Sequence, residues 1–348
     1  MKKIDNNAHK NLLVVLTARL ARRRRRKHNP PKRLKLVEGQ AWIRFPRELG
    51  ISNGLNIQPF IKRVQMAGRI RGTKIILDLS AVEKINAAAM ILLHANVASI
   101  INRRGGDVAF RLRLPIEDKA CQVLKQIGFL DCIGYDEEAE IIPCEEDVVH
   151  WHATSGFGAE GAKYDAVVQD YLRTRIPGQF DSKLYNSVSE AMTNVSQHAY
   201  LDLHKPDRER EYKPWWMFSQ IKDDVLTVVF CDLGVGIPRT LPIRYSKLKA
   251  KLLATTAKSS GDGKAIAIAI KESISRTKKS HRGRGLGQIT SSIIDCEGGK
   301  VIVFSNKGYY ERSNGVEKPR YGSIKDSIGG TIISWQVPLL TTESEAAA

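Results

Sequence analysis

Apolar and polar positions follow two different periods through the first half of the chain. Short apolar runs typical of strands lie at 39–45, 73–79 and 107–114. Apolar residues spaced three and four apart predict helices at 56–67, 87–103 and 116–127. Because strands and helices alternate, residues 37–130 are predicted to form a small α/β domain.

The second half shows the same two signals in another arrangement. Apolar runs predict strands at 215–221, 225–231, 300–305 and 331–337. Helical spacing predicts helices at 162–173, 181–200 and 288–295. Between the halves, residues 131–149 are acidic with little periodicity, and 156–161 have the composition of a loop. Residues 131–178 are therefore predicted to be a linker with a connecting helix.

The helix at 187–200, SVSEAMTNVSQHAY, carries the first candidate chemistry. Glu190, Asn194 and His198 are four residues apart, so on a helix they share one face over two turns. A carboxylate and a carboxamide one turn apart can hold a metal-bound phosphate and a water molecule. Taken alone, the same pattern also fits an ordinary surface helix.

Three glycine-containing segments follow this helix: DLGVGI at 232–237, RGRGLG at 282–287 and GGTIISW at 329–335. In this order, the four elements resemble the GHKL family of ATP-binding domains, which includes gyrase, ninety-kilodalton heat-shock chaperones and histidine kinases. The helix matches the N box of that family, and the other segments match its two glycine boxes and its last conserved element. The sequence SEAMTN…HAY in this helix is most similar to the bacterial anti-sigma serine kinases. The resemblance covers about 181–340.

The resemblance implies a Mg²⁺-dependent ATP site. Asn194 would ligate the magnesium ion, and Glu190 would be the general base that orients and deprotonates the attacking group. Asp232 would accept a hydrogen bond from the exocyclic amine of adenine, and Gly234 and Gly236 would let the base lie close to the backbone. The residues implied to contact the nucleotide are Asn194, Asp232, Gly234, Gly236, Ile237, Gly283, Arg284, Gly285, Leu286, Gly287 and Thr331.

Two further features of the site follow from the same resemblance. The glycine-rich turn at 282–287 would present backbone N–H groups to phosphates where it enters the next helix. Residues 240–281, rich in lysine with a Ser/Gly segment inside, would be the lid over the nucleotide.

The first domain resembles the STAS fold of anti-sigma-factor antagonists, on the stretch IILDLSAVEKINAAAMILL at 75–93. In that family a phosphorylatable serine lies at the start of the helix after the aspartate-ending strand. Positions 86–89 are Asn, Ala, Ala and Ala here, so no hydroxyl is available for that switch. A docking or regulatory role toward a protein partner is the expectation, and an unrelated α/β domain is the alternative.

Charge is concentrated at the N-terminus. Residues 1–36 hold thirteen Lys or Arg and one acid, Asp5, which is +12 of the net +18 and leaves +6 for the rest. Six consecutive cations at Arg22–Lys27 predict a disordered arm. The arm either binds a polyanion such as DNA, RNA or an acidic partner, or serves as a solubilising tail.

No apolar run is long enough for a membrane span. The five scattered cysteines indicate reduced thiols, so we expect a cytoplasmic protein without membrane attachment.

We therefore expect an α/β protein: a basic arm at 1–36, a STAS-like domain at 37–130, a linker and connecting helix at 131–178, a GHKL domain at 179–340 and a tail at 341–348. The GHKL domain would have the Bergerat fold, an α/β sandwich with helices layered on a mixed sheet. The expected function is Mg²⁺-dependent ATP binding in an ATPase or ATP-driven regulatory switch. The alternatives are a serine protein kinase acting on a STAS partner, and a non-hydrolysing ATP-gated module that binds nucleic acid or a partner.

Overall fold

The computed structural model describes residues 36–51, 56–104, 107–135, 141–142, 145–178, 180–200, 213–244, 261–273, 285–291 and 293–340. Several sequence predictions lie outside the described residues: nearly all of the basic arm with Arg22–Lys27, much of the expected lid, Gly283, Arg284 and the tail at 341–348. The described part has mixed helices and strands with parallel and antiparallel sheets, so the predicted α/β class is confirmed.

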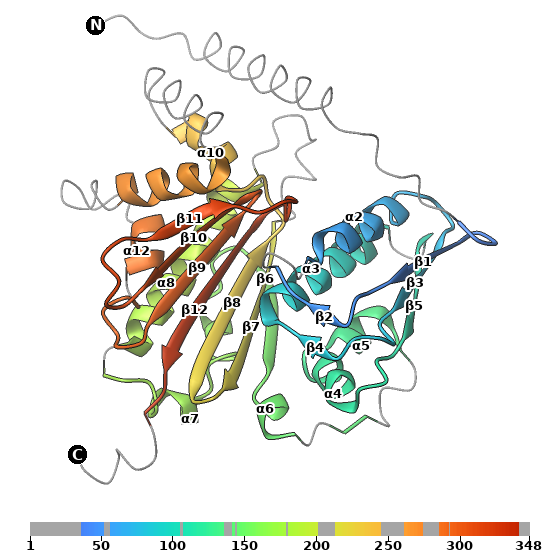
Figure 1. Cartoon of the computed structure of the whole chain (residues 1–348), viewed down its shortest axis with the longest axis horizontal. Coiled ribbons are helices and arrows are strands. Elements are labelled where there is room, and N and C mark those ends of the chain that lie inside the picture. The colour runs from blue at the N-terminus through green and yellow to red at the C-terminus, as the bar shows by residue number, and fades with distance from the viewer. Residues whose placement is uncertain are drawn as a thin grey trace, which may run out of the picture.

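A seven-stranded sheet forms the centre of the molecule (Figure 1). Its order is β11-β10-β9-β12-β8-β7-β6. The strands are β6 (His152–Phe157), β7 (Pro214–Lys222), β8 (Val225–Asp232), β9 (Lys300–Ser305), β10 (Gly308–Ser313), β11 (Arg320–Ser323) and β12 (Thr331–Pro338). All six pairings are antiparallel, whereas we expected a mixed sheet. Short turns join β7 to β8 and β9 to β10, and such connections require antiparallel neighbours.

Both faces of this sheet are covered. Along β7, Trp215 and Met217 join the core beneath the helices of one face, while Trp216 and Phe218 join the core on the other face. A strand that is buried on both sides needs apolar residues at consecutive positions, which explains the run WWMF. The sheet therefore lies as a central layer between two groups of helices.

The helices of the first face carry most of the predicted site (Figure 1). They are α8 (Phe180–Asn194), α10 (Ile237–Arg244), α12 (Gly285–Ser291) and a helix over 261–273. Helix α8 packs against α12. The helix predicted at 288–295 thus starts three residues earlier, so the last two glycines of RGRGLG lie inside its first turn.

A second, smaller unit covers the other face. Helix α3 (Ala87–Arg104) packs on β7, β8 and β12, and its opposite side packs on α2 (Gln58–Ala67) and a small parallel sheet. That sheet has the order β1 (Gln40–Arg44), β3 (Lys74–Asp78), β5 (Ala109–Arg113). The remaining elements of the unit are β2 (Glu48–Leu49), β4 (Lys84–Ile85), α4 (Asp118–Gln126), α5 (Phe129–Ile133) and α6 (Glu146–Val149).

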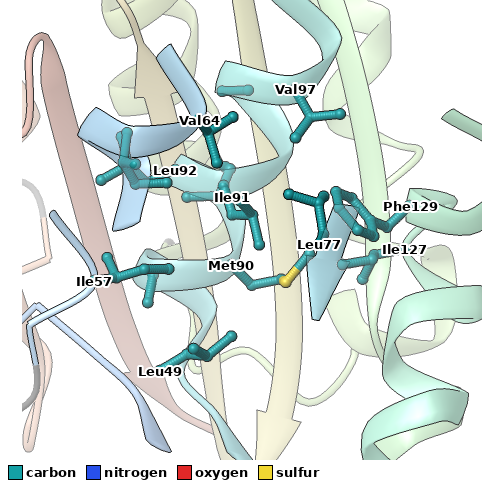
Figure 2. Close-up of a cluster of buried hydrophobic side chains, with 14 of the residues drawn as sticks. Leu49, Ile57, Val64, Leu77, Met90, Ile91, Leu92, Val97, Ile127 and Phe129 are labelled. Carbon is teal, nitrogen blue, oxygen red and sulfur yellow. The ribbon is translucent and has the colours of Figure 1, made fainter. Parts of the chain in front are cut away.

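Figure 2 shows why α3 is almost wholly apolar. Met90 and Ile91 of α3 lie among Leu77 of the small sheet and Phe129 of α5, and all four side chains are at most 1 % exposed. Fully burying each such side chain contributes about 1.5–3 kcal/mol. Helix α3 therefore holds the small unit and the large sheet together as one continuous core.

The stretch that we expected to be a linker and connecting helix belongs in part to the large-sheet unit. Strand β6 extends that sheet, and it occupies part of the expected loop at 156–161. In place of the helix at 162–173 there are a 3₁₀ turn (Gly161–Tyr164) and α7 (Asp170–Arg173). Gly156 allows β6 to pair closely with β7, because a Cβ at position 156 would lie 2.7 Å from the ring of Trp215.

Among the described residues, none of the helices has the length and apolar character needed to cross a membrane.

Candidate functional site

Helix α8 holds Glu190 and Asn194 one turn apart on one face, as the spacing predicts. The Asn194 side-chain amide donates to the backbone oxygen of Glu190 at 2.8 Å, and its Nδ2 lies 3.4 Å from Glu190 Oε1. Both side chains are half-buried. The carboxylate and carboxamide therefore form one compact polar pair.

The four-residue spacing does not continue to His198. After Asn194 the helix widens into a π-helix over Val195–Ala199. Because a π-helix has more residues per turn than an α-helix, His198 does not stack directly over Asn194. Such a widening is frequent at functional sites, and here it ends at Ala199, which holds the next segment of the site.

Gly285 brings the second glycine segment against the polar pair. A Cβ at this position would lie 2.8 Å from Glu190 Oε1, 3.3 Å from Asn194 Nδ2 and 3.4 Å from Asn194 Oδ1. Glycine at 285 lets the start of α12 lie this close without displacing the ends of the two side chains. The structure thus brings together two segments that are ninety residues apart in the sequence.

The DLGVGI segment is attached to the end of the same helix. The N–H of Val235 donates to the oxygen of Ala199 at 2.7 Å, and a Cβ on Gly234 would lie 2.3 Å from that oxygen. The Tyr200 hydroxyl accepts the N–H of Leu233 at 3.1 Å and donates to the oxygen of Pro214 at 2.6 Å. Packing against Ala199 therefore explains Gly234, which the sequence assigned to contact with the base.

Two residues that sequence reasoning missed fix the other side of this segment. The Ser305 hydroxyl accepts the N–H of Ile237 at 2.8 Å, and the Asn306 side chain donates to the oxygen of Val235 at 2.9 Å. Gly236 has a φ of +82°, and a Cβ there would lie 2.4 Å from Asn306 Nδ2. The side chain of Ile237 lies in the core.

Asp232 ends β8 and is only 6 % exposed. Its Oδ1 accepts the N–H of Gly234 at 2.8 Å, and Thr331, its partner across the strand pair, also donates to it. Burial raises the pKa of Asp232 to about 7, against the opposing effect of these hydrogen bonds. Among the described residues no cationic side chain pairs with it. Buried carboxyl groups with a raised pKa are frequent at functional sites.

The other two described residues of the second glycine segment, Leu286 and Gly287, make contacts within the protein. Leu286 lies in the core, and the N–H of Gly287 donates to the Ser273 hydroxyl at 3.0 Å. This hydrogen bond joins α12 to the helix at 261–273, which lies within the expected lid. In this arrangement the Gly287 amide faces Ser273 and not a phosphate.

Contacts in the structure link all four predicted segments in one network. Gly285 meets the end of α8, the π-helix after α8 holds the DLGVGI segment, and Thr331 meets Asp232 at the end of that network. The elements also outline a cleft of about 330 Å³ nearer the start of α8, which does not include Glu190 or Asp232. Its lining includes Lys183, Asn186, Gln288, Ser291 and Arg312.

The part of the chain that the structure describes has no group of three or more His, Cys, Asp or Glu that could hold a metal ion. The four described cysteines form no disulfide bonds.

No known protein-family model matches this chain, and no curated protein matches it either.

Proposed function

We propose that this protein binds ATP with Mg²⁺ at a GHKL-type site and acts as an ATPase or ATP-driven regulatory switch. The observation that carries the proposal is the contact of Gly285 with Glu190 and Asn194. Three residues from two distant segments meet where the GHKL resemblance requires a metal-bound phosphate. Glycine at 285 also leaves the space beside the polar pair free of any side chain from α12.

The donor set fits a magnesium ion bound together with phosphates. Magnesium prefers oxygen ligands and takes few of them from the protein, and a carboxylate and a carboxamide are both present here. Asn194 would hold the ion, which would neutralise charge on the phosphates. Glu190 would orient the attacking water and accept its proton.

Asp232 would recognise adenine at the other end of the site. Above its pKa of about 7 the carboxylate is ionised, so it accepts a hydrogen bond from an amine but cannot donate one to a keto group, and adenine is favoured over guanine. Gly234 and Thr331 hold the carboxylate in a fixed position. The contacts of Ser305 and Tyr200 support the segment around it.

The small unit would be a STAS-like domain without a phosphorylation switch. Ala87, Ala88 and Ala89 occupy the expected serine region, and all three are buried at the start of α3. Because α3 packs on the large sheet of the same chain, an external partner would have to bind another surface of this unit. If the protein is a serine kinase, the alternative reading, its substrate is therefore a different molecule.

The proposal places the protein in the cytoplasm, in agreement with its free thiols. The third alternative, a non-hydrolysing module that binds nucleic acid through Arg22–Lys27, concerns residues outside those described.

Calorimetry and single-turnover assays with labelled ATP test the proposal. The wild-type protein should bind Mg²⁺-ATP and release phosphate. Glu190→Gln should retain ATP binding and lose turnover by at least about 100-fold, because general base catalysis contributes 10²–10⁴-fold. Asp295→Asn, at an exposed carboxylate beyond α12, is the matched control and should behave as wild type.

Three results would count against it. If the folded wild-type protein gives no heat with Mg²⁺-ATP, the site assignment is wrong. If Glu190→Gln loses binding together with turnover, Glu190 is not a base. If label accumulates on an added protein and not as free phosphate, the kinase alternative replaces the ATPase.

A further inference from the structure

Among the described residues, one face of the small parallel sheet is partly open to solvent: its outer strands expose their side chains there, whereas Ile76 and Asp78 of the central strand are buried. Side chains alternate along its strands, and one set joins the core through Ala41, Ile43, Ile75, Leu77 and Phe110. The other set forms three rows across the strands: Gln40, Lys74 and Ala109; Trp42, Ile76 and Arg111; Arg44, Asp78 and Arg113. Parallel sheets are normally covered on both faces. We call this second set the open face.

The open face is strongly cationic. Lys74, Arg44, Arg111 and Arg113 are all exposed, and the single carboxylate, Asp78, is nearly buried, with a side chain 1 % exposed. Burial alone would raise the pKa of Asp78, but hydrogen bonds from its neighbours Ser80 and Arg44 hold that pKa below its usual value. Asp78 therefore stays ionised, and with four cations and one carboxylate the open face carries a net charge of +3.

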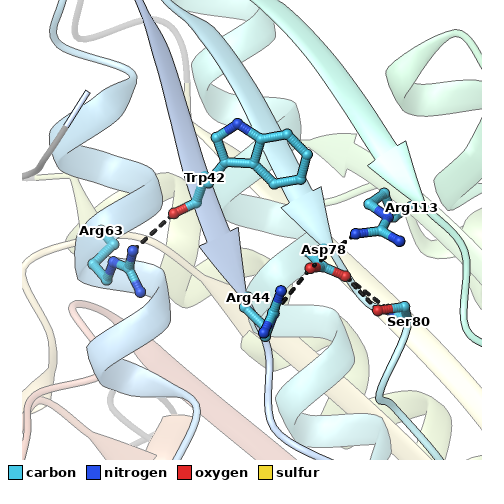
Figure 3. Close-up of polar contacts among 6 residues, drawn as sticks. All are labelled: Trp42, Arg44, Arg63, Asp78, Ser80 and Arg113. Carbon is cyan, nitrogen blue, oxygen red and sulfur yellow. Dashed lines mark hydrogen bonds and ion pairs between the residues drawn. The ribbon is translucent and has the colours of Figure 1, made fainter. Parts of the chain in front are cut away.

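Asp78 holds two of the guanidinium groups in place (Figure 3). Its Oδ2 accepts Arg44 Nε at 3.0 Å and lies 3.7 Å from a terminal nitrogen of Arg113. Ser80 donates its hydroxyl to the other oxygen at 2.5 Å. Arg44 and Arg113 nevertheless keep 75 % and 55 % of their side chains exposed. The buried carboxylate thus fixes two arginines and leaves their remaining donors toward solvent.

Trp42 lies in the adjacent row, about 7 Å along the strands from these arginines. It is 39 % exposed, whereas the other four tryptophans are at most 6 % exposed. Arg63 of α2 donates to its backbone oxygen at 2.8 Å, which fixes the edge of the sheet there. A planar aromatic ring is therefore held beside guanidinium groups on a rigid strand.

We infer that the open face binds single-stranded nucleic acid, with Trp42 stacked on a base and Arg44, Arg111 and Arg113 against phosphates. Aromatic side chains beside cations on an uncovered sheet are the arrangement with which proteins bind single strands. An acidic peptide would use the cations but would offer no flat partner to the tryptophan. The inference is independent of the ATP site and of Arg22–Lys27, which is a separate segment.

Binding of a labelled polyuridine strand of about twelve nucleotides to the full-length protein, followed by anisotropy and by tryptophan emission, tests the inference. Stacking should quench the emission of the exposed Trp42. Trp42→Ala should weaken binding roughly tenfold, and Trp42→Phe should retain most of the affinity. Arg111→Gln should weaken binding and lower the slope of log affinity against log salt by about one. Lys222→Gln, at an exposed lysine on the large sheet, is the control and should leave affinity unchanged.

Two outcomes would overturn the inference. If Trp42→Ala binds the strand as tightly as wild type, bases do not stack on this face, whether or not the basic arm holds the strand. If polyglutamate quenches Trp42 emission as strongly as polyuridine does, the open face binds acidic chains in general. Thermal unfolding of each variant shows whether it is folded.

Discussion

Replacing Asp232 with asparagine separates the cost of this residue to the fold from its proposed role in binding. Asparagine has nearly the same shape but carries no charge. In the folded protein the carboxylate is buried and accepts hydrogen bonds from Gly234 and Thr331, and no cation from the described part of the chain pairs with it. The variant therefore removes the buried charge and keeps an acceptor for those donors.

The magnitude follows from the pKa of Asp232, which burial raises from 3.8 to about 7. A raised carboxyl pKa means that its contribution to stability is fully present below pH 3.8 and is lost as the pH rises through about 7. One pKa unit corresponds to about 1.4 kcal/mol. Because the folded-state carboxyl is half ionised at about pH 7, the wild-type protein should lose about 2 kcal/mol relative to Asp232→Asn between pH 5 and pH 7.

Urea unfolding of both proteins at several pH values measures this difference. The free energy of unfolding of the variant minus that of the wild type should rise from pH 5 to pH 7 and then level off. At any single pH, the difference in unfolding free energy also includes the cost of any hydrogen bond that asparagine forms less well than aspartate. The change of this difference with pH does not include that cost. Asp223→Asn, at an exposed turn carboxylate after β7, is the control for the loss of one carboxylate at the protein surface.

The same variant should bind ATP less tightly, so that added Mg²⁺-ATP raises its unfolding temperature less than that of wild type. If Asp232→Asn is more stable than the wild type near pH 8 but is stabilised less by Mg²⁺-ATP, Asp232 serves binding at a cost to stability. A difference in unfolding free energy that stays constant from pH 5 to pH 8 would refute the assigned titration. Unchanged ATP affinity would remove Asp232 from the adenine site.

Four further substitutions test other parts of the structure. Gly285→Ala should lower ATP affinity at least about tenfold with little loss of stability in urea unfolding, because its Cβ would meet only the flexible side-chain ends of Glu190 and Asn194. Gly330→Ala, whose Cβ would lie 2.0 Å from the backbone oxygen of Asp232, should instead destabilise the fold; equal effects of the two glycine changes would contradict this distinction. Tyr200→Phe should cost about 1–3 kcal/mol in the same assay, because the N–H of Leu233 loses its acceptor, and no loss would mean that water replaces the hydroxyl. His94→Leu should make unfolding free energy less sensitive to acid between pH 6.5 and about 4, and an unchanged acid profile would contradict the burial of a neutral imidazole.

Strands with a continuous apolar run could be predicted from the sequence. The apolar runs placed β3, β8, β9 and β12 within one or two residues of their observed bounds. Strands β10 and β11, with sequences GYYERS and RYGS, gave no such signal because most of their side chains are half-exposed or exposed. Strand β6 was missed for the same reason, since only one of its six residues is buried.

In the candidate site, too, residues defined by a local pattern could be predicted, whereas those defined by contacts between distant segments could not. Glu190 and Asn194 could be predicted because their spacing is a property of one helix. Tyr200, Ser305 and Asn306 act only through contacts with the distant DLGVGI segment, so no local pattern identifies them. The contact of Gly234 with Ala199 likewise depends on the π-helix, which the sequence pattern did not predict.

The two faces of the large sheet carry buried titratable groups whose effects on stability oppose each other. His94 of α3 lies between Phe129 and Phe218, its Nδ1 has no partner among the described residues, and burial lowers its pKa from 6.5 to about 4. Stability from neutral His94 is present above pH 6.5 and is lost as the pH falls through about 4, whereas that from Asp232 is lost as the pH rises. Between these limits the two slopes, each about 1.4 kcal/mol per pH unit, nearly cancel in the wild type. Their separate contributions should therefore appear only in the single variants, with stability rising with pH in Asp232→Asn and falling with pH in His94→Leu.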